Sequence, residues 1–166
     1  TIAGYAGTGK TTIVENMINY AQTKGLNVKV LAPTNAAARV LERKFKAAGL
    51  NVEAMTIHKA IYGQPNKFGK FSLRGESLNG LVIIDEFSMV GKKMYKDLLI
   101  AGKEAQEKAG FVYIGDPFQL KPVKQEEVGL LERPTTLLTE VKRTDRESEI
   151  LKLATAMRYL REMIIL

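Results

Sequence analysis

Near its amino end the chain reads Gly4-Tyr5-Ala6-Gly7-Thr8-Gly9-Lys10-Thr11, which follows the pattern G-x-x-x-x-G-K-[ST] at every position. The apolar pair Ile2-Ala3 precedes this stretch, and a segment with helical spacing follows it from Lys10 to Lys24. A strand, a glycine-rich turn and a helix in this order form a phosphate-binding loop. The backbone N–H groups of the turn and the positive end of the helix then face one anion.

The groups of this loop suit the phosphates of a nucleotide. Lys10 brings a mobile positive charge to the β and γ phosphates, and the Thr11 hydroxyl can ligate Mg²⁺. We therefore predict that ATP and Mg²⁺ bind here. The predicted nucleotide-binding residues are Gly4, Ala6, Gly7, Thr8, Gly9, Lys10, Thr11 and Thr12.

An acidic pair follows an apolar run farther along the chain. The run Leu81–Ile84 has the continuous apolar character of a parallel strand that is buried on both faces. Asp85 would hold Mg²⁺ through water, and Glu86 would orient and deprotonate the attacking water. Such a pair often merely caps the next helix, but a phosphate loop about 75 residues upstream makes a role in nucleotide hydrolysis the stronger interpretation. The second carboxylate favours hydrolysis over transfer to an acceptor hydroxyl.

The rest of the chain alternates β-rich runs with helical patterns, which predicts an α/β fold with a parallel sheet covered on both faces. Its length of 166 residues suits one domain. Further strands are expected at Asn27–Leu31, Phe111–Ile114 and Thr136–Thr139, a short strand or turn at Ala54–Thr56, and further helices at Asn35–Ala48, Lys92–Lys108 and Glu147–Arg161.

One segment, Tyr62–Asn79, interrupts this alternation. It combines glycines with Pro65, Phe68, Phe71 and several charges, which is typical of an inserted hairpin or loop. Long loops in compact domains are often functional, but a plain surface connection would show the same pattern. Both interpretations stay open at this point.

The composition is that of a folded, basic protein. Hydrophobic residues make up 45% of the chain, and the formal net charge is +7 at pH 7. The positive excess favours a polyanionic partner, nucleic acid first, although a merely basic surface would give the same sum. The absence of cysteine excludes disulfides and cysteine-based metal sites. No stretch reaches the roughly 18 apolar residues that cross a bilayer, so we expect no membrane partner.

When all its motifs are taken together, the chain resembles superfamily 1 DNA helicases of the branch that contains Dda and RecD. The likeness covers nearly the whole chain, and a series of motifs in the family's order is far more specific than any one motif. It implies a RecA-like P-loop NTPase domain. The matching segments are Gly4–Thr12 for motif I, Leu31–Leu41 for motif Ia, Thr56–His58 for motif Ib, Ile84–Val90 for motif II, Ile114–Val123 for motif III and Leu138–Thr144 for motif IV.

The resemblance assigns roles to two residues that stand out little by themselves. Gln119 would sense the γ-phosphate and link the nucleotide to the DNA groove, which suits a neutral amide that can donate or accept. Arg143 would stabilise charge on the γ-phosphate in the transition state, as a fixed planar cation can. Without the family, Arg143 would be an ordinary surface residue. The predicted catalytic residues are Lys10, Glu86, Gln119 and Arg143.

A binding site for single-stranded DNA is implied where two strands end. Pro33, Thr34 and Asn35 lie at the junction of a strand and a helix, where exposed amides could hold a DNA phosphate. Simple helix capping by Thr34 or Asn35 is the alternative, and both roles could hold at once. Thr56 and His58 are similar to family residues that line the single-strand groove, although a lone histidine is more often structural.

The family also has parts that this chain lacks or modifies. The insert Tyr62–Asn79 falls where this branch has a small pin or wedge, in which Phe68 and Phe71 would stack on bases or pack the hairpin itself. By this resemblance we expect the segment that grips adenine and the second RecA-like domain to lie outside these residues, and the chain to begin inside its first strand. We therefore interpret residues 1–166 as a first motor domain truncated at both ends. The bulky Phe118 in motif III has no predicted effect.

The function that the resemblance implies is that of an ATP-dependent DNA helicase, which translocates 5′ to 3′ on single-stranded DNA in its full-length parent. It would be a monomer in the cytoplasm of a bacterial or phage-infected cell, in DNA replication, repair or recombination. One alternative is a P-loop ATPase of another nucleic-acid machine, such as a clamp loader or packaging motor. Another is a non-catalytic fragment that holds nucleotide or DNA. RNA as the substrate is not excluded.

Overall fold

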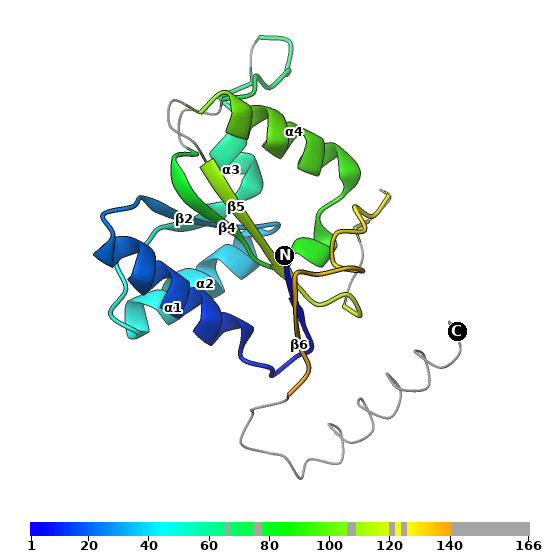
Figure 1. Ribbon diagram of the computed structural model, residues 1–166. Coiled ribbons are helices and arrows are strands. Elements are labelled where there is room, and N and C mark those ends of the chain that lie inside the picture. The colour runs from blue at the N-terminus through cyan, green and yellow to red at the C-terminus, as the bar shows by residue number, and fades with distance from the viewer. Residues whose placement is uncertain (66, 75–77, 106–108, 120–121, 124–125, 141–166) are drawn as a thin grey trace, which may run out of the picture.

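The structure is a computed structural model that describes residues 1–65, 67–74, 78–105, 109–119, 122–123 and 126–140. These residues form one six-stranded sheet with helices on both faces (Figure 1). The elements are β1 (Ile2–Gly4), α1 (Lys10–Thr23), β2 (Val28–Ala32), α2 (Asn35–Ala47), β3 (Ala54–Thr56), α3 (Ile57–Ile61), β4 (Gly80–Ile84), the 3₁₀ turn η1 (Phe87–Met89), α4 (Lys92–Lys103), β5 (Ala109–Gly115) and β6 (Thr136–Leu138).

All strand pairs in this sheet are parallel, and the strand order is β3-β2-β4-β5-β1-β6. β1 lies between β5 and β6, with Ala3 opposite both Gly115 and Leu137. Because the strands run in one direction, the loops that follow β1, β2, β4 and β5 emerge at the same edge, where parallel sheets bind ligands. The predicted RecA-like α/β architecture is confirmed.

The core has two layers, one on each face of the sheet. Ile83 packs with residues of α1 and α2, and the next residue, Ile84, packs with residues of α3 and α4. β4 is therefore buried on both faces, as its continuous apolar sequence predicts. The helices contribute fully or nearly fully buried residues at helical spacing, among them Val14 and Ile18 of α1, Leu41 and Phe45 of α2, Ile57 and Ile61 of α3, and Leu98 and Ala101 of α4.

The helices differ from the sequence prediction in two respects. α4 ends at Lys103 instead of Lys108, because the chain must turn back for β5 to begin at Ala109, which pairs with Gly80. The short helix α3 was not predicted, since its five residues are too few to show a period. The helix predicted at Glu147–Arg161 lies outside the described residues. Within the described part of the chain, no helix is long and apolar enough to cross a membrane.

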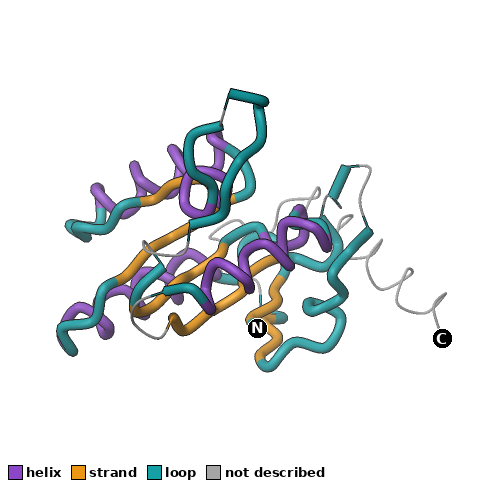
Figure 2. The backbone as a smooth tube through the Cα atoms, turned by 90° about the horizontal axis from the view of Figure 1, so that it is seen from above, coloured by secondary structure: helices purple, strands orange, loops and turns teal. Residues whose placement is uncertain are grey.

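The insert is closed at its base like a hairpin and projects from the body of the domain (Figures 1 and 2). Tyr62 and Leu73 form an antiparallel bridge. Beside it, the N–H of Gly63 donates to the carbonyl oxygen of Ser72 at 2.9 Å. The insert therefore leaves the fold directly after α3 and returns before β4 without interrupting the sheet.

Candidate active site

The segment between β1 and α1 folds as a loop that requires its glycines. Gly7 and Gly9 have φ values of 81° and 85°, in the left-handed region that favours glycine. Gly4 is limited by space, because a Cβ there would lie 2.7 Å from Oγ1 of Thr8. Thr8 closes the turn, since its N–H and its hydroxyl both donate to the carbonyl oxygen of Tyr5, at 3.3 and 2.8 Å. A side chain at any of these three glycine positions would thus be sterically unfavourable.

The amino end of α1 is open toward this loop. Its N-cap residue is Gly9, so no side chain caps the helix, and no acidic residue lies in its first turn. Thr11 is half-buried and Thr12 is exposed in that first turn. The positive end of the helix dipole is therefore left to an anion from outside the chain.

Lys10 lies folded back over the loop. Its Nζ donates to the carbonyl oxygens of Gly4 at 2.7 Å and Tyr5 at 2.9 Å. The ammonium group is thus placed within the loop that would surround a phosphate. It would exchange these neutral acceptors for a charged one when a phosphate binds, and hydrogen bonds to charged partners are the stronger kind.

The acidic pair follows β4 in a strained turn. The N–H of Asp85 donates to the carbonyl oxygen of Leu31 at 2.9 Å, and the Asp85 carboxylate accepts from the N–H of Glu86 at 2.9 Å. Glu86 has φ 52°, and it is the non-glycine residue with a positive φ in the described part of the chain. Strain of this kind costs about 1–3 kcal/mol and collects at functional sites.

Electrostatics joins the acidic pair to the phosphate loop. Burial raises the pKa of Asp85, while the Glu86 N–H and the charge of Lys10 lower it. Burial also raises the pKa of Glu86, and the charge of Asp85 adds to that rise; Lys44 and Lys10 oppose it. Additional positive charge, such as that of a divalent cation, would therefore stabilise the ionised form of both carboxylates.

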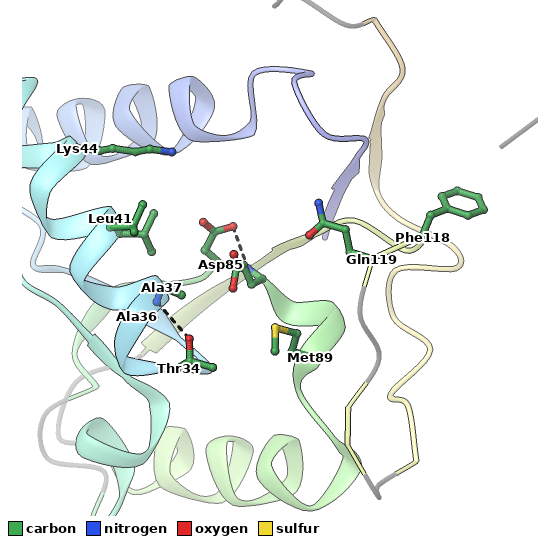
Figure 3. Close-up of a pocket in the computed structure, with 11 residues that line it drawn as sticks. Thr34, Ala36, Ala37, Leu41, Lys44, Asp85, Met89, Phe118 and Gln119 are labelled. Carbon is green, nitrogen blue, oxygen red and sulfur yellow. Dashed lines mark hydrogen bonds between the residues drawn. The ribbon is translucent and has the colours of Figure 1, made fainter. Parts of the chain in front are cut away.

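An open cavity of about 900 Å³ lies between α2 and the ends of β4 and β5 (Figure 3). Among the predicted site residues, Thr34, Asp85, Glu86 and Gln119 line it, whereas residues 4–12 do not. Sequence reasoning missed its apolar wall, although helical spacing along α2 could have indicated it. That wall consists of Ala36, Ala37, Val40 and Leu41, with Lys44 at its end and Met89 from η1.

A tight turn after β5 holds Gln119 at this cavity. Asp116 is 4% exposed, and its carboxylate accepts from the N–H of Phe118 at 3.0 Å. Its carbonyl oxygen accepts from the N–H of Gln119 at 3.1 Å. Sequence reasoning passed over Asp116, whose place between a buried strand and a proline is typical of a residue that organises a turn.

The predicted DNA-contacting threonines are helix caps. Thr34 accepts from the N–H of Ala37 at 3.2 Å, and Thr56 accepts from the N–H of Lys59 at 3.1 Å. The capping alternative predicted for Thr34 is thus present, and Thr56 caps α3, for which no capping role was predicted. Because Ala32 lies opposite Thr56 in the sheet, the neighbouring ends of β2 and β3 bring Pro33–Asn35 close to Thr56 and His58.

Aromatic rings connect His58 to the insert. The ring of His58 lies 5.2 Å from that of Tyr62, which lies 5.9 Å from that of Phe71. Phe71 thus packs against the base of its own hairpin, as one of the two sequence interpretations held. Phe68 is 88% exposed. Arg143 lies outside the described residues.

Comparison with known proteins points to one family. The AAA domain family matches residues 1–162. The chain is 32% identical over 159 residues to the ATP-dependent RecD2 DNA helicase of Deinococcus radiodurans, covering 92% of this chain and 21% of that protein. It is 32% identical over 173 residues to the ATP-dependent DNA helicase dda of Enterobacteria phage T4, covering 95% of this chain and 37% of that protein.

A solved structure of the Arterivirus nonstructural protein 10 (helicase) in complex with DNA aligns with a TM-score of 0.49 at 17% identity. That alignment covers 84% of this chain and 35% of the viral chain. The chain thus spans well under half the length of the relatives it matches.

Proposed function

This chain belongs to the AAA domain family, in the Dda/RecD-like branch of superfamily 1 helicases, and we propose that this helicase motor domain hydrolyses Mg-ATP to move on single-stranded DNA. One observation carries the proposal. The acidic pair at the end of β4 shares a cavity with Gln119 and lies within the electrostatic influence of the phosphate-loop residue Lys10. A cation, a half-buried acid pair and an amide around one phosphate position are the groups that ATP hydrolysis needs.

Mg²⁺ fits the donors that the chain offers. The Thr11 hydroxyl and the Asp85 carboxylate are hard oxygen ligands, and Mg²⁺ is usually bound by one or two such groups together with waters and substrate phosphates. In the described part of the chain, no group of three or more His, Cys, Asp or Glu side chains could hold a metal by itself. The bound ion would neutralise charge on the phosphate oxygens.

The chain's own residues would act in sequence. Lys10 would leave the carbonyl oxygens of Gly4 and Tyr5 and pair with the β and γ phosphates. Glu86 would accept the proton of the attacking water. Gln119 would contact the γ-phosphate from the opposite loop, and by family resemblance Arg143 would stabilise the transition state.

For DNA we propose the strip formed by Pro33, Thr34, Asn35, Thr56 and His58, which the pairing of β2 with β3 supports. The N–H groups at the start of α2 can reach a phosphate that lies above the Thr34 cap. The exposed Phe68 would stack on a base at the tip of the insert, which would then act as a pin. The 5′ to 3′ direction, a monomeric state, a cytoplasmic location and a second RecA-like domain come from the resemblance.

The test is ATP hydrolysis by the full-length protein with and without a single-stranded DNA oligonucleotide. We expect strong stimulation by DNA, and a loss of at least about 100-fold in turnover for Glu86→Gln with nucleotide binding retained. Glu42→Gln, on the exposed side of α2, is the matched control. Hydrolysis indifferent to DNA would instead favour another P-loop machine, and binding without turnover a non-catalytic role. An RNA oligonucleotide in parallel shows which sugar is preferred.

A further inference from the structure

Two aromatic residues that this chemistry does not use contact each other beside the site. The ring centroids of Tyr5 and Phe118 lie 5.5 Å apart, with the ring planes inclined by 45°. This separation lies within the range of favourable aromatic pairs. Tyr5 belongs to the phosphate loop and Phe118 to the turn after β5. The contact therefore joins the loops that follow two adjacent strands, β1 and β5.

The backbone carbonyl group of Tyr5 is a hydrogen-bond acceptor within the phosphate loop. Its carbonyl oxygen accepts from Nζ of Lys10 at 2.9 Å and from the hydroxyl of Thr8 at 2.8 Å. If Lys10 moves to a bound phosphate, Tyr5 loses one of these donors. The position of the Tyr5 ring is then set by different contacts in the empty and the occupied loop.

The turn that carries Phe118 is a single unit with Gln119. Asp116, which is 4% exposed, accepts from the N–H groups of both residues, at 3.0 and 3.1 Å. Both residues line the cavity, and Figure 3 shows their side chains extending in different directions from the turn. A displacement of the Phe118 ring would therefore shift the Gln119 amide, which extends from the same turn.

We propose that Tyr5 and Phe118 are positioning residues that couple occupancy of the phosphate loop to the placement of Gln119, and through it nucleotide binding to DNA binding. The connection runs from Lys10 to the Tyr5 carbonyl, through the two rings, and along the Asp116 turn to Gln119. It gives a role to Phe118, which the sequence left without one. This inference rests on the proposed function, because coupling requires that both ligands bind.

The test measures the dissociation constant of a single-stranded DNA oligonucleotide from the full-length protein, with and without a non-hydrolysable ATP analogue and Mg²⁺. The ratio of the two constants is the coupling factor. We expect Tyr5→Ala and Phe118→Ala each to bring this factor toward one by about 2- to 30-fold. The double variant should lose no more than either single variant, because both interrupt one connection. The analogue's affinity with and without DNA must change by the same factor.

Conservative variants separate coupling from mere packing. Tyr5→Phe and Phe118→Tyr keep both rings and should keep the wild-type coupling factor, as should Tyr20→Ala, which removes a ring that is 66% exposed on α1. A purely structural role would lower the melting temperature or both affinities and leave the factor unchanged, which would overturn the inference. So would additive losses in the double variant. A wild-type protein whose hydrolysis ignores DNA would refute the proposed function itself, so the two failures are distinguishable.

Discussion

At the scale of single residues, Lys10 lies within the phosphate loop. Its ammonium group donates to Gly4 and Tyr5, so the loop holds the charge where a phosphate would bind. We predict that Lys10→Ala abolishes ATP binding by the full-length protein in a calorimetric titration, since the variant lacks the cation that lies within the loop itself. Lys24→Ala, at the far end of α1, should bind normally. Near-normal affinity of Lys10→Ala would sink the phosphate-loop assignment.

Glu86 combines a chemical role with an unfavourable backbone conformation. At φ 52° a glycine is relaxed, whereas a residue with a side chain carries about 1–3 kcal/mol of strain. Part of this gain is offset, because glycine makes the unfolded chain more flexible and so lowers the free energy of unfolding by roughly 0.5–1 kcal/mol. We therefore predict that Glu86→Gly raises the free energy of unfolding by about 0.5–2 kcal/mol, measured by denaturant titration, while hydrolysis is lost.

Glu86→Gln serves as the control for this experiment, because it removes the charge and keeps the strained backbone. If Glu86→Gly proved less stable than Glu86→Gln, relief of backbone strain would not be the dominant effect at this position. The comparison separates what the side chain does in catalysis from what its conformation costs the fold.

At the scale of elements, one hydrogen bond ties the base of the insert to α4. The hydroxyl of Tyr62 donates to the Asp97 carboxylate at 2.5 Å, and burial together with this bond raises the pKa of Tyr62 to about 12. We predict that Tyr62→Phe lowers the free energy of unfolding by about 1–2 kcal/mol, as for a bond to a charged group that is partly exposed.

The pH dependence of that difference follows from the sign of the shift. A raised pKa means that the folded state favours the protonated hydroxyl. The stabilisation is therefore fully present below the ordinary tyrosine pKa of about 10 and is lost as the pH rises through about 12. The difference in the free energy of unfolding between wild type and Tyr62→Phe, measured by denaturant titration, should therefore be equal at pH 7 and pH 9. A difference that already shrinks between these values would contradict the assignment of this bond.

At the scale of the whole molecule, the proposed motor function implies a second domain that closes with this one on the same nucleotide. This chain supplies the phosphate loop, the acidic pair and Gln119 along one open edge of its sheet. We predict that residues 1–166 alone do not unwind a forked DNA duplex and hydrolyse ATP slowly, whereas the full-length protein does both. Unwinding by the isolated chain would show that one domain suffices.

The sequence predicted where the phosphate loop and the acidic pair lie in the fold, because neighbouring residues determine both positions. The phosphate loop needs only its own glycines and the helix after it, and Asp85 and Glu86 are placed by the apolar strand before them. The end of α4 was predicted too late, because the pairing of β5 with β4 decides it. The contact between Tyr5 and Phe118 joins residues far apart in the chain, so no local pattern indicates it.

The position of β1 has a consequence for how this protein acquires its site. β1 comes first in the chain but pairs with β5 and β6, and the carbonyl oxygen of Thr1 accepts from the N–H of Thr136 at 3.1 Å. Pairings across such a sequence separation form late, because a long loop must close before they contribute. During synthesis the phosphate loop leaves the ribosome before β5 and β6, so it has no neighbouring strand until β5 has emerged. The phosphate loop therefore gains the strands on either side of it only after residues 109–138 have been synthesised.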